Sequence, residues 1–219
     1  MPQRYTLIVG TKQWSSWSLR AWLSMRATGA EFREITVRLR RPETRAEIRR
    51  LAPADKVPVL RIEEAGAPVT VFDSLAICET LAERHTDAQL WPADFAARAE
   101  ARSISAAMHS GFAVLRESLS MEFARSFPTP ALSPDVEAEI AMIQNFWREA
   151  LDKYGGNGGF LFGRFSIADC MYAPVVSRFR TYGIALDPVV DAYCDRIWAL
   201  PAMQDWLVAA KTELESGLC

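Results

Sequence analysis

The sequence has few of the residues that build metal sites and disulfide bonds. Its 219 residues include only two histidines and four cysteines. The cysteines are far apart and form no CxxC pair that could hold zinc or exchange disulfides; they are Cys78, Cys170, Cys194 and Cys219. We therefore expect reduced thiols and no bound metal.

Long apolar runs and a strong net charge are also missing. The first apolar stretch, YTLIV, is too short for a signal peptide, and no window approaches the roughly 20 apolar residues of a membrane span. The formal net charge of -2 gives no field that would attract nucleic acid or an acidic membrane. The one basic cluster, RLRRPETRAEIRR, has no interleaved aromatic residues, which favours a solvated surface. We expect a cytoplasmic protein without nucleic-acid or membrane partners.

The first 84 residues alternate short apolar runs with helical patterns. Apolar runs and period-two alternation predict strands, and apolar residues at helical spacing predict helices. Pro58 donates no ladder hydrogen bond, so it should stand where its strand begins. The predicted order is βαβ, then α, then ββα, with strands at 5–9, 32–39, 57–63 and 69–72 and helices at 17–28, 42–51 and 74–84.

After a stretch without periodicity, HTDAQLWPADF, the patterns are helical throughout. We place a linker at residues 85–93 and an all-helical domain at 94–219, after a first domain at 1–84. Segments rich in proline, glycine and asparagine separate the helices. The predicted helices span 96–123, 134–154, 167–182, 188–199 and 201–214.

Two neighbouring motifs carry a family resemblance. They are KVPVL, residues 56–60, and VFDSLAICETLAE, residues 71–83. Together they resemble the second half of the glutathione-binding domain of cytosolic glutathione transferases. By that resemblance, Pro58 is cis, Lys56 and Val57 lie along the glutathione peptide, and Asp73 and Ser74 hold the γ-glutamyl end. A helix start with free N–H groups suits a carboxylate, although Asp-Ser before a helix could also be a plain cap.

A serine pair lies between the first strand and the first helix, in WSSWSLRAW, residues 14–22. It resembles the SSCSWR stretch of zeta-class transferases and the serine motif of theta-like bacterial members. The match implies that Ser15, or alternatively Ser16, contacts the glutathione sulfur, while Trp17 replaces a zeta-class cysteine. Hydroxyl and N–H donors at a helix start stabilise a thiolate, but the same serines could be an ordinary cap.

A third motif, FSIADCMYAPV at residues 165–175, resembles the capping box of a later helix in the family. Ser166 would cap the helix and Asp169 would answer it, a role in folding. The resemblance then covers nearly the whole chain. It implies a thioredoxin-like α/β domain followed by an all-α domain, with glutathione as cosubstrate, no metal, and a homodimer.

Candidates for the electrophile pocket are less specific. Trp14 and Trp17 are the better ones, because a loop cannot bury two indoles wholly in the first domain. Met108 and Phe112 could line the pocket or belong to the helical core. His109 could face the cleft, although a lone helical histidine is more often packed or solvated. We expect Cys78 to be a core residue and Tyr5 not to replace Ser15 as the hydroxyl donor.

The predicted function is addition of the glutathione thiolate to a small hydrophobic electrophile. One alternative is a zeta-type cis–trans isomerase acting on a maleylacetoacetate-like substrate, with Arg20 and Arg116 as candidate partners of the substrate carboxylates. The other is a protein that binds glutathione without turnover.

Overall fold

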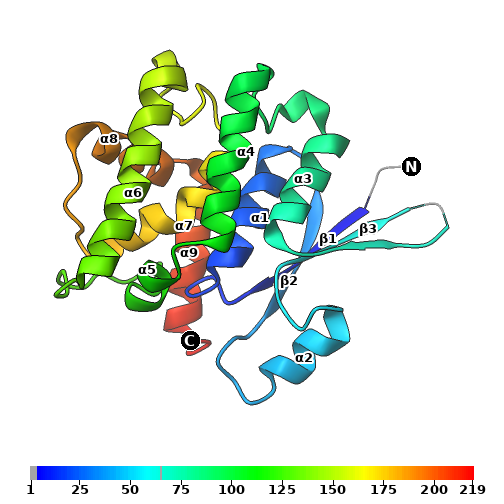
Figure 1. Ribbon diagram of the computed structural model, residues 1–219. Helices are drawn as coiled ribbons and strands as arrows, with labels where there is room; N and C mark the ends of the chain where they lie inside the picture. Colours follow the sequence, from blue (N-terminus) through cyan, green and yellow to red (C-terminus); the bar gives the residue numbers. More distant parts are fainter. Residues whose placement is uncertain (1–3, 65) are drawn as a thin grey trace.

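The structure is a computed structural model that describes residues 4–219 apart from residue 65. A four-stranded sheet with helices on both faces is followed by a bundle of helices (Figure 1). This is the thioredoxin-like domain plus all-helical domain that the resemblance implies. The residue boundaries given above for the two domains and the linker remain predictions.

The sheet has the strand order β2-β1-β3-β4. The central strand β1 runs parallel to β2 and antiparallel to β3, which pairs with β4. Alternation along β1 divides its side chains: Tyr5, Leu7 and Val9 join the main core, and Ile8 joins a small cluster beneath α2. The strands are β1 Arg4–Gly10, β2 Phe32–Val37, β3 Val59–Glu63 and β4 Val69–Val71.

Helix α1 (Ser16–Ala27) is the centre of the molecule. It packs against α3 (Ser74–Arg84) and also against α7 (Ile167–Thr181) of the bundle. Helix α2 (Thr44–Leu51) covers the opposite face of the sheet, at the lower right of Figure 1. Because α1 contacts elements on every side, apolar and polar residues along it are buried alike.

The helical region differs from the prediction in one important place. The single helix expected at 96–123 is two helices, α4 (Phe95–Ser110) and α5 (Ala113–Ser118). Gly111 ends α4, and Phe112 adopts a left-handed conformation with φ of 57°. Apolar residues continue at helical spacing through this point, and Phe112 and Leu115 are both buried. The sequence pattern alone therefore does not reveal the break.

The remaining helices follow the prediction more closely. Helix α6 (Pro134–Ala150) is followed directly by a π-helical turn, Leu151–Gly155. A short turn, Thr86–Ala88, lies within the expected linker. The capping box is confirmed: the Ser166 N–H donates to Asp169 Oδ2 at 2.8 Å. No helix among the described residues is long and apolar enough to span a membrane. The last helices are α6 Pro134–Ala150, α8 Pro188–Trp198 and α9 Pro201–Glu215.

Candidate functional site

A cavity of about 660 Å³ lies where the β1–α1 loop, the start of β3 and the start of α3 meet. It brings together ten of the residues singled out from the sequence: Trp14, Ser15, Ser16, Trp17, Lys56, Val57, Pro58, Asp73, Ser74 and His109. The Val57–Pro58 peptide is cis, as the resemblance implies. We call this space the first cavity.

Met108 and Phe112 are not brought to this cavity. Met108 is fully buried in the main core, and the Phe112 ring packs on Phe146 with 6.4 Å between ring centroids. Their helical spacing is the same for core and pocket residues, so the sequence could not separate the two. Trp14 and Trp17 are half-buried, as expected for residues in a cavity wall.

Ser15 is held by a short network at the start of α1. It occupies the N-cap position without a side-chain cap bond, and its hydroxyl hydrogen-bonds with that of Ser18, with 2.7 Å between the Oγ atoms. Ser18 Oγ also accepts the Gly10 N–H at 3.0 Å. In this structure the Ser15 hydroxyl donates to Ser18 Oγ. Because a hydroxyl can both donate and accept, rotation of the Ser18 hydroxyl toward Ser15 would free Ser15 to donate to a ligand. The sequence motif contains Ser18 but gives no signal for this role.

The opposite wall holds an acid and a buried hydroxyl. Asp73 caps α3 by accepting the Leu75 N–H on Oδ1 at 3.1 Å, and its Oδ2 lies 3.0 Å from His109 Nε2. Ser74 Oγ is buried without a hydrogen-bond partner among the described residues. His109 also contacts the edge of Trp17, with 5.3 Å between ring centroids. Among the described lining residues, His109 is the only one that comes from the helical region.

A second cavity, of about 330 Å³, adjoins the first across shared walls. Trp14, Ser16 and Trp17 line both. Its other lining residues come mainly from α5, the segment after α5, and α7; they are Arg40, Ala113, Arg116, Glu117, Ser120, Met121 and Arg178. Ser16 therefore lies at the junction of the two spaces, whereas Ser15 faces the first cavity alone.

Arg20 is not available to a ligand in either cavity. Its side chain is fully buried, and its guanidinium lies 4.3 Å from the centroid of the Trp17 ring. Burial, followed by repulsion from Arg178 and Arg116, lowers the pKa of Arg20 to about 9. Arg20 supports Trp17 from within the protein, whereas Arg116 does line the second cavity. The sequence could not tell these two arginines apart.

The buried thiols take no part in this site. Cys78 is fully buried on α3, and burial raises the pKa of its thiol to about 12. A thiol in that state stays protonated and is a poor nucleophile at neutral pH. This agrees with its expected place in the core.

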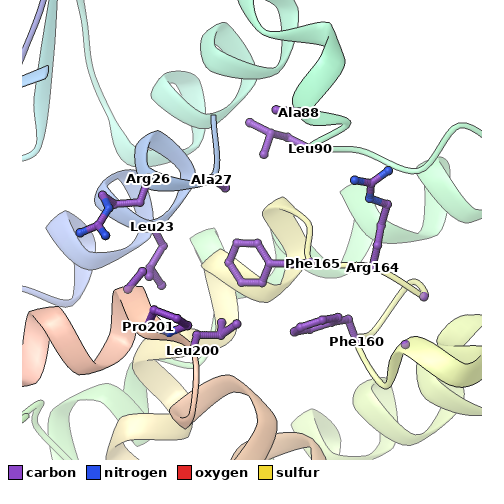
Figure 2. A pocket seen from close by; sticks show the side chains of 13 residues that line it. Leu23, Arg26, Ala27, Ala88, Leu90, Phe160, Arg164, Phe165, Leu200 and Pro201 are labelled. Carbon is purple, nitrogen blue, oxygen red and sulfur yellow. The ribbon is translucent and has the colours of Figure 1, made fainter. Parts of the chain in front are cut away.

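Another cavity, of about 520 Å³, lies on a different side of α1. In Figure 2 the Phe165 ring projects among Leu23, Leu200 and Phe160, and the walls are mostly apolar. None of the residues singled out from the sequence lines it. The chemistry of the side chains, rather than volume, therefore places the candidate site in the first two cavities.

Comparison with known families agrees with this geometry. Residues 14–84 match the family model described as "Glutathione S-transferase, N-terminal domain", and residues 133–207 match "Glutathione S-transferase, C-terminal domain". The chain belongs to the glutathione transferase superfamily. Both cavities draw on residues of the matched N-terminal segment.

Individual members of the superfamily are distant. Glutathione transferase Omega 2S from Trametes versicolor has a TM-score of 0.73 and 21% identity, with 99% of each chain covered. A maleylacetoacetate isomerase from Anaeromyxobacter dehalogenans 2CP-1, with GSH bound in its active site, has a TM-score of 0.67 and 27% identity over 93% of this chain and 95% of that one. A probable maleylacetoacetate isomerase of Caenorhabditis elegans is 38% identical over 96 residues, a match that spans 44% of this chain and 42% of that relative.

Proposed function

We propose that this glutathione transferase relative binds glutathione in the first cavity, ionises its thiol, and transfers the thiolate to a small electrophile in the second cavity. One observation carries the proposal: the serine pair, Val57, and the Asp73–Ser74 pair line a single cavity. These residues are far apart in sequence, and each has the chemistry that one part of glutathione needs.

The γ-glutamyl end fits the wall formed by the start of α3. Asp73 presents a half-exposed carboxylate for the ammonium group, and the unpartnered Ser74 hydroxyl can donate to the carboxylate at the positive end of α3. Val57 offers backbone groups to the peptide, with Lys56 beside it. His109 holds Asp73 Oδ2 and so fixes the direction in which the acid faces.

The sulfur fits the start of α1. Ser15 donates a hydrogen bond to the thiolate, with Ser16 as the alternative, and the positive end of the helix adds to this stabilisation. A thiol with an ordinary pKa near 8.5 can lose one or more units in such a place, which yields a large thiolate fraction at neutral pH. The serine is a hydrogen-bond donor here, and the nucleophile is the glutathione sulfur.

The test compares Ser15→Ala with Ser16→Ala. Tryptophan fluorescence reports glutathione binding, and ultraviolet absorbance of the bound thiolate at several pH values reports ionisation. We expect Ser15→Ala to raise the thiol pKa by about one unit or more with little change in affinity, and Ser16→Ala to have a smaller effect. Ser103→Ala, an exposed substitution on α4, is the control. Absence of glutathione binding by the unaltered protein would overturn the proposal.

A cis–trans isomerase is the second candidate, favoured by the similarity to maleylacetoacetate isomerases and by the position of Arg116 in the second cavity. Transfer consumes one glutathione thiol for each electrophile, whereas isomerisation regenerates it. Thiol titration during turnover of a maleyl-type substrate therefore separates the two. Glutathione binding without turnover of any electrophile would support a binding protein instead. We also propose a homodimer, which sedimentation would test.

A further inference from the structure

The second cavity contains a buried arginine with a free nitrogen. Arg178 on α7 is 3% exposed; its Nε donates to the Leu119 carbonyl at 2.7 Å and its Nη1 to the Pro174 carbonyl at 3.2 Å. Nη2 has no hydrogen-bond partner among the described residues, and Arg178 lines the cavity. The two backbone carbonyls thus fix the guanidinium and leave one donor position for a ligand.

A second arginine lines the same space from α5. The Arg116 Nε donates to the Phe112 carbonyl at 3.2 Å, and its guanidinium lies 5.3 Å from the centroid of the Trp17 ring. The break between α4 and α5 separates the two helices just before this residue. The helix breaks here although the helical period of the sequence continues, and the break lies between His109, which lines the first cavity, and Arg116, which lines the second. Such a departure from the local pattern is expected where local structure serves a site.

No ion pair among the described residues balances the positive charge of Arg116 and Arg178. Burial, followed by repulsion from Arg116, lowers the pKa of Arg178 to about 10, so it remains charged at neutral pH. The buried guanidinium of Arg20 adds to the same field, and its three nitrogens lack partners among the described residues. Glu117 is the only acidic side chain among the described lining residues, and it is exposed and forms no ion pair in that part of the chain.

We propose that the second cavity binds a carboxylate group of the electrophile, held by Arg116 and Arg178. The inference rests on the proposed function and narrows it from small electrophiles in general to those that carry a carboxylate. A carboxylate matches the planar fork of a guanidinium, and a largely desolvated charged hydrogen bond is strong. Because Trp14, Ser16 and Trp17 are walls of both cavities, a molecule anchored on these arginines lies beside the proposed position of the sulfur.

The chemical step needs no further reactant. The thiolate sulfur forms a bond with the electrophilic carbon, and the leaving group departs with the electron pair of the bond that breaks. With a 4-(chloromethyl)benzoate, the products are the glutathione conjugate and chloride. The carboxylate takes no part in bond making and serves only as the anchor.

The experiment uses two conjugates of nearly the same shape, one with a carboxylate and one with a neutral amide in its place: S-(4-carboxybenzyl)glutathione and S-(4-carbamoylbenzyl)glutathione. Binding is followed by tryptophan fluorescence, so the result does not depend on turnover. The variants are Arg116→Met, which keeps much of the side-chain volume, and Arg116→Lys, which keeps the charge. Arg102→Met is the matched control, because Arg102 also stacks on a tryptophan, Trp91, but lines neither cavity.

We expect the unaltered protein to bind the carboxybenzyl conjugate about tenfold more tightly than the carbamoyl conjugate. Arg116→Met should remove most of that preference, Arg116→Lys should restore part of it, and Arg102→Met should leave it unchanged. Glutathione itself should bind all four proteins equally. Equal binding of the two conjugates by the unaltered protein would overturn the carboxylate site while the proposed function stands. Absence of glutathione binding would overturn both.

Discussion

The two cavities that meet at Trp17 differ in where their residues come from. The first takes all of its described lining residues except His109 from positions 14–74, whereas most of the second lies at positions 113–178. The first presents a carboxylate, Asp73, and the second presents the guanidinium groups of Arg116 and Arg178. The difference suggests a division of labour, in which the α/β region holds the common cosubstrate and the helical region selects its partner.

The largest expected effect concerns the acid of the first cavity. Asn caps helices as well as Asp does, so Asp73→Asn should leave α3 intact while removing the charge that we propose faces the γ-glutamyl ammonium. We expect glutathione affinity to fall about 10- to 100-fold, or about 1.4–2.7 kcal/mol, in a fluorescence titration. The preference between the two benzyl conjugates should survive, because it depends on the second cavity.

Asp94→Asn is the matched control for that change. Asp94 caps α4 by accepting the Ala97 N–H at 2.8 Å, but it lines neither cavity. Its substitution should leave glutathione affinity unchanged. If both variants lost affinity equally, the loss would not be specific to the Asp73 charge, and the assignment of Asp73 to the ammonium group would be wrong.

The sequence predicted the first cavity much better than the second, for a physical reason. The residues of the first cavity belong to short motifs. Each motif lies either between a strand and the following helix or at the start of a strand. Ser15, Val57 and Asp73 could therefore be assigned through the family resemblance that those motifs carry. The order of strands and helices along the α/β region was also predicted from local patterns, because apolar periodicity reports which face of an element is buried.

The second cavity depends on contacts that no local pattern records. Arg178 lies in α7, and the residues before and after it in the sequence are buried. The packing of α7 on the segment after α5 places its side chain at the second cavity. Arg20 shows the opposite case. The sequence around it resembles a binding motif and made it a candidate for a substrate carboxylate, but its side chain on α1 is completely buried. Burial of a charged residue depends on tertiary packing, and propensity does not reveal it.

The break between α4 and α5 offers a way to perturb the second cavity indirectly. A Cβ added at Gly111 would lie 2.9 Å from the Ala107 carbonyl oxygen, so the backbone of Gly111→Ala must shift. We expect the free energy of unfolding to fall by about 1–2 kcal/mol in urea denaturation. The preference for the carboxybenzyl conjugate should fall more than the affinity for glutathione, because Arg116 follows the break.

Ser110→Ala is the control for the glycine variant. Ser110 is exposed and adjacent, and its hydroxyl only returns a hydrogen bond to the Ala106 carbonyl at 3.0 Å. Its removal should change stability by less than about 0.5 kcal/mol. Loss of glutathione affinity without loss of conjugate preference in Gly111→Ala would show that the break serves the first cavity and that the division of labour is wrong.

The smallest expected effect tests whether the first cavity is organised locally. Ser18 is fully buried and joins the Ser15 hydroxyl to the Gly10 N–H, so Ser18→Ala should leave Ser15 in place but less firmly oriented. We expect the ratio of thiolate to thiol in bound glutathione at a fixed pH near neutrality to fall about two- to threefold, equivalent to about 0.4–0.7 kcal/mol. The binding preference for the carboxybenzyl conjugate should not change, since Ser18 does not line the second cavity. A loss of that preference, with the thiolate fraction unaltered, would mean that the start of α1 positions Trp17 and the electrophile rather than the sulfur.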